Sequence, residues 1–198
     1  MVDIWRNKMT NVPTLEGYGC RLRPVKVEDA EFIVKLRNQS FAKGMIHATS
    51  TSVEKQIQWI ANWQLRENDY YWIIETTGEG VESIGTIGLY DLELEMKEGM
   101  PGRWIMLPQN EVNIMAPFLL LYGFVFEVLC LDRVVMDVVA DNKKVRRFHE
   151  LYGARYIEPP ARYVDAESEV GMPLVWFEFS SSQWPDMNEY WKSILEVF

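Results

Sequence analysis

The sequence predicts an α+β domain in which helices flank a central mixed, mostly antiparallel sheet. Two stretches indicate this fold class. Residues 70–76 and 81–94 are strand-like runs joined by the turn Gly78-Glu79-Gly80, which is typical of an antiparallel pair. Residues 102–154 follow the order strand, loop, helix, strand, helix, which predicts a parallel unit with a ligand site at a helix start. A sheet that contains both units has strands running in both directions.

Each predicted element has its own local pattern. Pro24 stops the first strand, and the acidic stretch 93–102 is interpreted as a bend. A strongly apolar helix at 118–129 precedes a β-branched strand at 133–139. In chain order we expect strand 18–25, helix 27–37, helix 52–65, strands 70–76, 81–94 and 104–107, helix 118–129, strand 133–139, helix 142–153, strands 155–157 and 172–180, and a last helix from Trp184.

Length and composition restrict the class of protein. With 198 residues the chain suits a single domain, in which residues 1–17 form an N-terminal arm and residues 181–198 a C-terminal helix. The net charge of -9 argues against a nucleic-acid partner. The longest apolar run, 118–131, is too short to span a membrane, and the first residues show no signal peptide. We expect a cytoplasmic protein with two buried free thiols, Cys20 and Cys130, and no metal site.

Four segments carry a resemblance to a known family. They are Leu22-Arg23-Pro24 with Glu28-Asp29-Ala30, then 84–89 (IGTIGL), 126–134 (FEVLCLDRV) and 140–154 (ADNKKVRRFHELYGA). In this order they resemble the GNAT acetyltransferase superfamily, and more closely the branch of ribosomal-protein N-terminal and amino-sugar N-acetyltransferases. The resemblance covers roughly residues 18–179 and implies a GNAT-like fold.

The resemblance also implies an activity. Members move an acetyl group from acetyl-CoA to an amine, so the expected partner is a small-molecule primary amine and acetyl-CoA is the co-substrate. The segment GRWIML, which contains Trp104, is similar to members that act on a nucleotide-linked amino sugar. The alternatives are a protein N-terminal acetyltransferase and a non-catalytic coenzyme A-binding module. The sequence leaves open whether the protein forms a homodimer.

The cofactor site implied by the resemblance includes one departure from the family pattern. GNAT proteins carry a glycine-bearing loop before the helix that binds pyrophosphate, whereas residues 109–115 (QNEVNIM) contain no glycine. Backbone N–H groups at a helix start can still bind an anion. The cofactor-binding candidates are Ile105, Met106 and Leu107 on the fourth family strand, Gln109, Asn110, Val112, Asn113, Ile114 and Met115 in the loop, and Asn142, Lys143 and Arg146 beyond.

Acetyl transfer requires an acid for the leaving sulfur, and the family usually supplies a tyrosine seven residues after the asparagine. Here that count from Asn142 gives His149, whose unperturbed pKa near 6.5 suits proton transfer. Tyr152, one helical turn on, is the rival acid. A structural role remains open for His149, and a helix N-cap role for Asn142. The basic cluster around Lys143 and Arg146 is interpreted either as a solvated face or as a contact with coenzyme A phosphates.

The acceptor side is the least defined part of the predicted site. In this fold it is shaped by the first two helices, their connecting loop and the end of the third family strand. The substrate-binding candidates are Arg37, Asn38, Tyr90 and Trp104.

Overall fold

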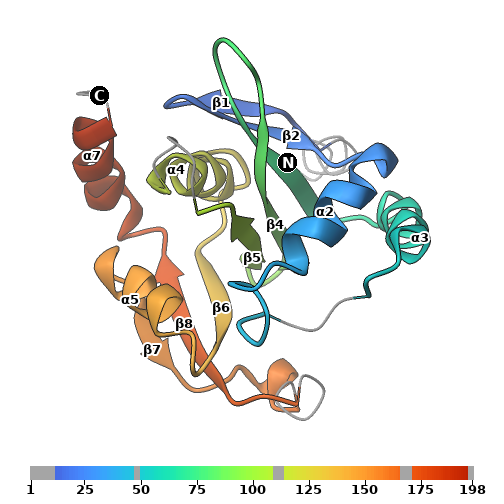
Figure 1. Cartoon of the computed structure of the whole chain (residues 1–198). Helices are drawn as coiled ribbons and strands as arrows, with labels where there is room; N and C mark the ends of the chain where they lie inside the picture. The colour runs from blue at the N-terminus through green and yellow to red at the C-terminus, as the bar shows by residue number, and fades with distance from the viewer. Residues whose placement is uncertain (1–11, 47–49, 109–113, 166–170, 196–198) are drawn as a thin grey trace.

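The protein, in a computed structural model, is described over residues 12–46, 50–108, 114–165 and 171–195. Within these residues one sheet of eight strands has the order β1-β2-β3-β4-β5-β6-β8-β7 (Figure 1). Strands β5 and β6 pair in parallel, and all other neighbours are antiparallel. The predicted mixed, mostly antiparallel sheet is therefore confirmed. The strands are β1 (Leu15–Gly17), β2 (Cys20–Pro24), β3 (Tyr70–Thr76), β4 (Ser83–Glu93), β5 (Glu98–Met106), β6 (Arg133–Val139), β7 (Arg155–Ile157) and β8 (Leu174–Ser180).

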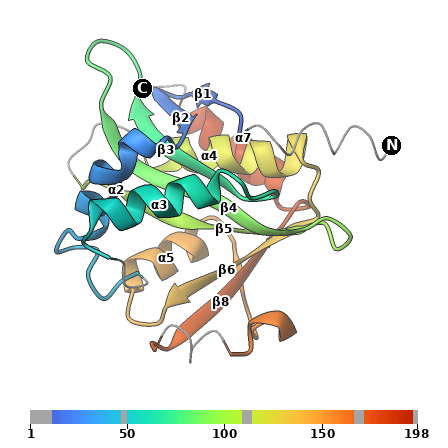
Figure 2. The same ribbon diagram turned by 90° about the vertical axis from the view of Figure 1, so that its right-hand side faces the viewer.

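Helices cover both faces of the sheet, as Figures 1 and 2 show. One face carries α2 and α3, and the other carries α4, α5 and α7. Ser52 caps α3, because its side chain accepts a hydrogen bond from the Lys55 N–H. The helices are α2 (Ala30–Arg37) after the 3-10 turn η1 (Val27–Asp29), α3 (Val53–Trp63), α4 (Met115–Gly123) extended by the π-helical turn η2 (Phe124–Val128), α5 (Lys143–Leu151) and α7 (Trp184–Leu195), with the 3-10 turn η3 (Ala161–Tyr163) before β8.

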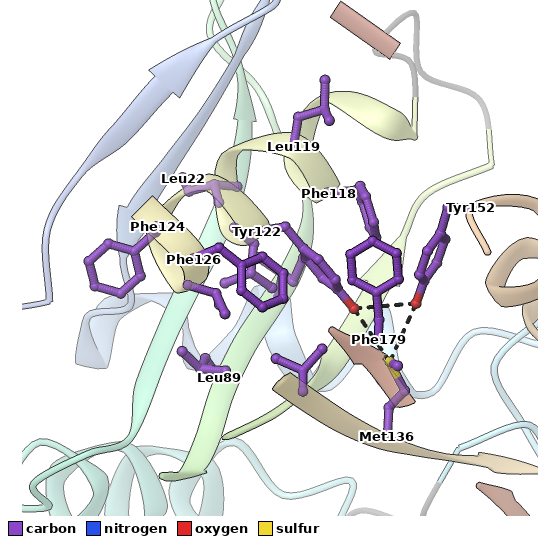
Figure 3. Packing of buried hydrophobic residues seen from close by; sticks show 14 of the residues in the cluster. Leu22, Leu89, Phe118, Leu119, Tyr122, Phe124, Phe126, Met136, Tyr152 and Phe179 are labelled. Carbon is purple, nitrogen blue, oxygen red and sulfur yellow. Dashed lines mark hydrogen bonds between the residues drawn. The ribbon is translucent and has the colours of Figure 1, made fainter. Parts of the chain in front are cut away.

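The main hydrophobic core lies between the sheet and α4, α5 and α7. Helix α4 is apolar on nearly every side, which is typical of a helix buried on all sides rather than of a surface helix. Figure 3 shows Phe118 and Tyr122 of α4 packed with Phe179 of β8 and Tyr152, just after α5. A helix held this firmly fixes the end of the loop that precedes it.

The prediction for β5 was wrong at its start. The acidic stretch 93–102 contains the first residues of the strand, and Glu98 is 0% exposed. A buried carboxylate needs a charged partner, and Glu98 accepts hydrogen bonds from Arg133 at 2.5 Å and from Arg162. Both partners are distant in sequence, so the local acidity misleadingly indicated a bend.

Two smaller expectations also needed correction. Residues 15–17 of the predicted arm form β1, which pairs with β2 through Leu15–Leu22 and Gly17–Cys20. Cys20 is buried as expected, but Cys130 is exposed, in a left-handed backbone conformation with φ 53°. Over the described ranges, no helix is long and apolar enough to cross a bilayer, and no group of three His, Cys, Asp or Glu side chains could hold a metal.

Candidate active site

Strands β5 and β6 separate soon after they begin. They are paired only at Glu98–Arg133 and Gly99–Val134. Beyond this point β5 stays with β4 as far as Met106, and β6 stays with β8 as far as Val139. The two edges therefore diverge in a V whose backbone groups are available to an extended ligand.

The backbone donors on β5 can be assigned to its two edges. The Leu107 N–H donates to the Ile84 carbonyl at 2.8 Å, so it points toward β4. Because successive N–H groups of a strand alternate, the Ile105 N–H also points toward β4 and the Met106 N–H points into the V. Of the three predicted residues, Met106 is the one whose N–H faces the opening.

A β-bulge lies beside the V. Thr86 pairs with Ile105 and Gly88 pairs with Gly102, so Arg103 and Trp104 together stand opposite one residue of β4. Arg103 has the left-handed φ of 50° that such a bulge requires. The buried Thr86 hydroxyl donates to the Arg103 carbonyl at 2.7 Å and so satisfies it.

The bulge places Arg103 and Trp104 on opposite faces of the sheet. Trp104 packs against Phe118 and Phe148, with ring centroids 6.3 and 5.2 Å away. Its Nε1 is buried and has no hydrogen-bond partner among the described residues. Trp104, predicted to bind the acceptor, thus lies with α4 and α5 and not with Arg37 and Tyr90.

His149 and Tyr152 form a buried network on the same face as Trp104. The Tyr152 hydroxyl contacts His149 Nδ1. It also lies 3.3 Å from the Tyr122 hydroxyl and 3.4 Å from Met136 Sδ (Figure 3). If Tyr122 donates to Tyr152 and Tyr152 donates to His149, the imidazole proton lies on Nε2. The sequence did not indicate a role in the network for Tyr122, because this residue lies one turn after Phe118 in an apolar helix and looks like a core residue.

Burial sets the protonation of this network. It lowers the pKa of His149 to about 4, although the Asp137 carboxylate acts in the opposite direction. It raises the pKa of Tyr152 well above its usual value, and that of Tyr122 as well. At neutral pH, His149 is therefore neutral and both tyrosines keep their protons.

Within the network, the two predicted acids pack against different elements. The His149 ring packs on Phe177 of β8, with centroids 5.0 Å apart, away from β5. Tyr152 lies between Phe118 of α4 and Phe148, which itself contacts Trp104 of β5. His149 therefore acts on Tyr152 from the side away from the V.

Helix α5 begins at an asparagine cap. Asn142 Oδ1 accepts from the Val145 N–H and Nδ2 donates to the Met45 carbonyl, both at 3.3 Å. Its structural N-cap role is thus confirmed, and the second bond joins α5 to the loop after α2. Arg146 is also engaged, because it donates to the Ala140 carbonyl at 3.0 Å and to the Tyr156 hydroxyl at 3.4 Å.

The remaining basic residues of α5 face solvent. Lys143 and Arg147 are exposed and line, with Arg146 and Glu150, a depression of about 320 Å³. Of the predicted loop residues, Ile114 is the exposed N-cap of α4 without a side-chain cap, and Met115 is the buried first residue of that helix. Gln109, Asn110, Val112 and Asn113 lie outside the described residues.

On the opposite face, Arg37 and Tyr90 come together with Arg103. The Arg103 guanidinium lies 4.4 Å from the Tyr90 ring centroid, and burial raises the pKa of Tyr90. A Cβ on Gly102 would overlap the Tyr90 hydroxyl, so this glycine lets Tyr90 lie across β5 near the apex of the V. Asn38 instead turns back on α2, because its Nδ2 donates to the Val34 carbonyl at 2.9 Å.

Three charged residues of this face were missed: Asp69, Arg103 and Asp137. Asp69 binds Arg103 through both carboxylate oxygens, and Arg103 falls between the predicted bend 93–102 and the predicted strand 104–107. Asp137 is half-buried on β6, and its charge raises the pKa values of Tyr90 and His149. A lone acid inside a β-branched strand was the available signal for Asp137. No such signal exists for Asp69, which is 34 residues from its partner in the sequence.

Comparison with known proteins now decides the family. The family model for the acetyltransferase (GNAT) domain matches residues 20–155. The chain belongs to the GNAT acetyltransferase family. A search of the curated proteins finds no match.

Solved GNAT structures resemble the whole fold. One is apo FdhC, described as a nucleotide-linked sugar GNAT, with 27% identity over 93% of this chain and 99% of FdhC, and a TM-score of 0.77. A GCN5-related N-acetyltransferase from Brucella melitensis has 17% identity over 93% of this chain and 86% of its own, with a TM-score of 0.75. A variant of SpeG, the spermidine N-acetyltransferase of Vibrio cholerae, has 14% identity over 85% and 97%, with a TM-score of 0.66. The latter two support the fold alone.

Proposed function

We propose that this protein is an N-acetyltransferase that moves the acetyl group of acetyl-CoA to the primary amine of a nucleotide-linked amino sugar. The V between β5 and β6 carries the proposal, because it offers the Met106 N–H to a thioester lying between the strands. The likeness to FdhC supports the acceptor class. A depression lined by Glu67, Asp69, Asp91 and Glu93 makes a polyamine the second candidate.

The described residues suggest how the reaction proceeds. The neutral amine attacks the thioester carbonyl, and the negative charge that forms on its oxygen is stabilised by the Met106 N–H. The C–S bond then breaks, and the Tyr152 hydroxyl gives its proton to the departing sulfur. Tyr122 and His149 hold Tyr152 in place, and solvent returns its proton after release of coenzyme A.

The nitrogen must also lose two protons, one from the bound ammonium before attack and one after the C–N bond has formed. Asp137 lies on β6 beyond the last residue pair with β5, and its charge raises the pKa of Tyr90 on β4. We assign Asp137 as the carboxylate that binds the acceptor ammonium, accepts its first proton and passes it to solvent, and then accepts the second proton from the nitrogen. The acetyl group therefore enters from the α4 and α5 face and the amine from the α2 and α3 face.

Release of free thiol from acetyl-CoA tests this proposal. The assay uses nucleotide-linked amino sugars, free amino sugars, spermidine and a peptide with a free N-terminus as acceptors. We expect turnover with the first class and a loss of about 10²-fold or more in kcat for Tyr152→Phe, with unchanged acetyl-CoA affinity by calorimetry. Binding of acetyl-CoA without turnover of any amine would instead support a non-catalytic module.

A matched variant separates chemistry from folding. Tyr156→Phe also removes one hydroxyl near α5, but from an exposed ring. We expect it to keep full turnover. If the two variants lose activity equally, Tyr152 is not the acid.

A further inference from the structure

The backbone of Arg103 is strained in a way that calls for an explanation. Its φ of 50° lies in the left-handed region, which glycine adopts freely and arginine does not. Glycine alone would satisfy the backbone conformation of the bulge at this position. The side chain of Arg103 therefore has a role that offsets the strain.

The guanidinium of Arg103 is rigidly held. Asp69 takes both terminal nitrogens, one of them at 2.9 Å, and the side chain of Asp69 is 8% exposed. The rings of Trp59 and Tyr71 lie 5.3 Å from the guanidinium carbon, and that of Tyr90 lies 4.4 Å away. Such a clamp holds the guanidinium in one fixed orientation, and Asp69 occupies two of its five N–H groups.

A second guanidinium, that of Arg37, interacts with Arg103. Arg37, at the end of α2, is half-buried and interacts electrostatically with Tyr71, Tyr90 and Arg103. Burial lowers the pKa of Arg37, and the positive charge of Arg103 lowers it further. Asp69 offsets one of these two positive charges, and the burial of two like charges close together favours the binding of a further anion.

We propose that Arg37 and Arg103 form an anion subsite that binds the phosphate groups of the acceptor, so that the protein selects nucleotide-linked amines. This inference rests on the proposed function and deepens it. It also agrees with the charges nearby, because Asp137 can take the ammonium end of the acceptor while the arginines take its phosphate end. A nucleotide-linked amino sugar carries both charges.

A neighbouring depression favours a different acceptor. It measures about 520 Å³ and lies between the segment before β3 and η3. Its charged lining consists of Glu67, Asp69, Asp91, Glu93, Arg66 and Arg162. The four carboxylates would suit a polyamine, so the test must compare the two classes of acceptor directly.

The test uses calorimetry to measure the binding of thymidine diphosphate and of uridine diphosphate to protein saturated with coenzyme A. Arg103→Gly is the informative variant, because glycine accepts the bulge conformation while the guanidinium is lost. We expect it to weaken nucleoside diphosphate binding at least tenfold and to leave acetyl-CoA affinity unchanged. The second result excludes the phosphates of coenzyme A as the ligand of this subsite.

Two further variants complete the design. Arg37→Gln should also weaken nucleoside diphosphate binding. If Arg103→Gly does not fold, Arg37→Gln alone tests whether the arginines bind the phosphates. Arg155→Gln, which removes an exposed arginine of β7, should change nothing. Unchanged nucleoside diphosphate affinity in both Arg103→Gly and Arg37→Gln, or a higher kcat/KM for spermidine than for the nucleotide-linked amine, would overturn the subsite.

The experiments distinguish a failure of this inference from a failure of the proposed function. If thiol release occurs but does not depend on Arg37 or Arg103, only the subsite is wrong. If no amine causes thiol release, the transferase proposal fails, and binding of nucleoside diphosphates still reports on the arginines.

Discussion

His149 shows how burial changes the chemistry of one residue. Its side chain is 7% exposed, and its pKa is about 4 instead of the ordinary value near 6.5. Position within the family motif predicted a titrating acid at this place. The packing of Phe177 and Tyr152 around the ring instead keeps it neutral, which suits a hydrogen-bond partner of Tyr152.

The depressed pKa of His149 predicts that stability depends on pH. Between pH 6.5 and pH 4 the unfolded chain binds a proton at this histidine and the folded protein does not. The free energy of unfolding therefore falls as the pH falls, by about 3 kcal/mol between pH 7 and pH 4 from this residue. Urea unfolding of the natural protein and of His149→Gln at both pH values measures the effect.

The variant isolates the histidine from the carboxylates that also titrate in this range. We expect His149→Gln to be less stable than the natural protein at pH 7, and to lose about 3 kcal/mol less on acidification. Parallel losses in the two proteins would show that His149 titrates normally in the folded state. The other histidine, His47, lies outside the described part of the chain and is left unchanged in both proteins.

At the scale of elements, β5 makes the site, and it was the strand least readable from sequence. Strands β3, β6 and β7 begin and end where their local patterns predict. The start of β5 depends on Arg133 and Arg162, which neutralise Glu98 from distant segments. Its bulge depends on the pairing with β4, and the sequence carries no signal that Arg103 adopts a positive φ.

The residues of the candidate site likewise divide into those that the sequence predicts and those that it does not. The family motif located Asn142, His149 and Tyr152 on one helix, because a helix keeps sequence spacing in space. Arg37 and Tyr90 also come together as predicted from the arrangement of elements. Asp69 reaches the site only through tertiary packing, and no local pattern points to it. For Asp137 the lone acid inside a β-branched strand was a local signal.

Gly102 provides a test of the β5 geometry. In Gly102→Ala the new Cβ would overlap the Tyr90 hydroxyl and reach 3.0 Å from ring atoms Cε1 and Cζ. We expect a loss of about 1–3 kcal/mol in the free energy of unfolding, together with displacement of Tyr90. Combination with Tyr90→Phe removes the worst overlap, so the double variant should lose less than the sum of the single variants.

Gly123→Ala is the matched control for this experiment. Its Cβ would find its nearest neighbour, a ring carbon of Trp184, at 3.7 Å, which is an ordinary contact. Because Gly123 lies in helix α4, alanine should leave the stability unchanged or raise it. Equal stability of the two alanine variants in chemical unfolding would contradict the proposed contact between Gly102 and Tyr90.

At the scale of the whole molecule, the sheet consists of two halves with little backbone pairing between them. Strands β1 to β5 form one half and β6 to β8 the other, joined in the sheet by two residue pairs. Helix α4 packs on the first half, and Tyr152 and Phe148 of the second half pack on α4. A thioester in the V would add contacts to both halves at once.

Acetyl-CoA should therefore stabilise the folded protein. At a concentration one hundred times its Kd, a ligand specific for the folded state adds about 2.7 kcal/mol, which raises Tm by roughly 5–10 °C for a chain of this size. The exposed basic residues of α5 should contribute through the phosphates, because they form a positive cluster on a protein of net charge -9. Thermal unfolding with acetyl-CoA at low and high salt measures both effects, and we expect high salt to weaken binding.

Acetyl-pantetheine separates the V from the basic helix, since it carries the thioester arm without phosphates. A triple variant, Lys143→Gln, Lys144→Gln and Arg147→Gln, should weaken acetyl-CoA binding about tenfold and leave acetyl-pantetheine binding unchanged. The reason is that these side chains lie in the first two turns of α5, whereas the V is lined by Met106 and Trp104 of β5. If the variant binds acetyl-CoA as tightly as the natural protein at low salt, the cluster is a solvated face and the phosphates bind elsewhere, at the start of α4.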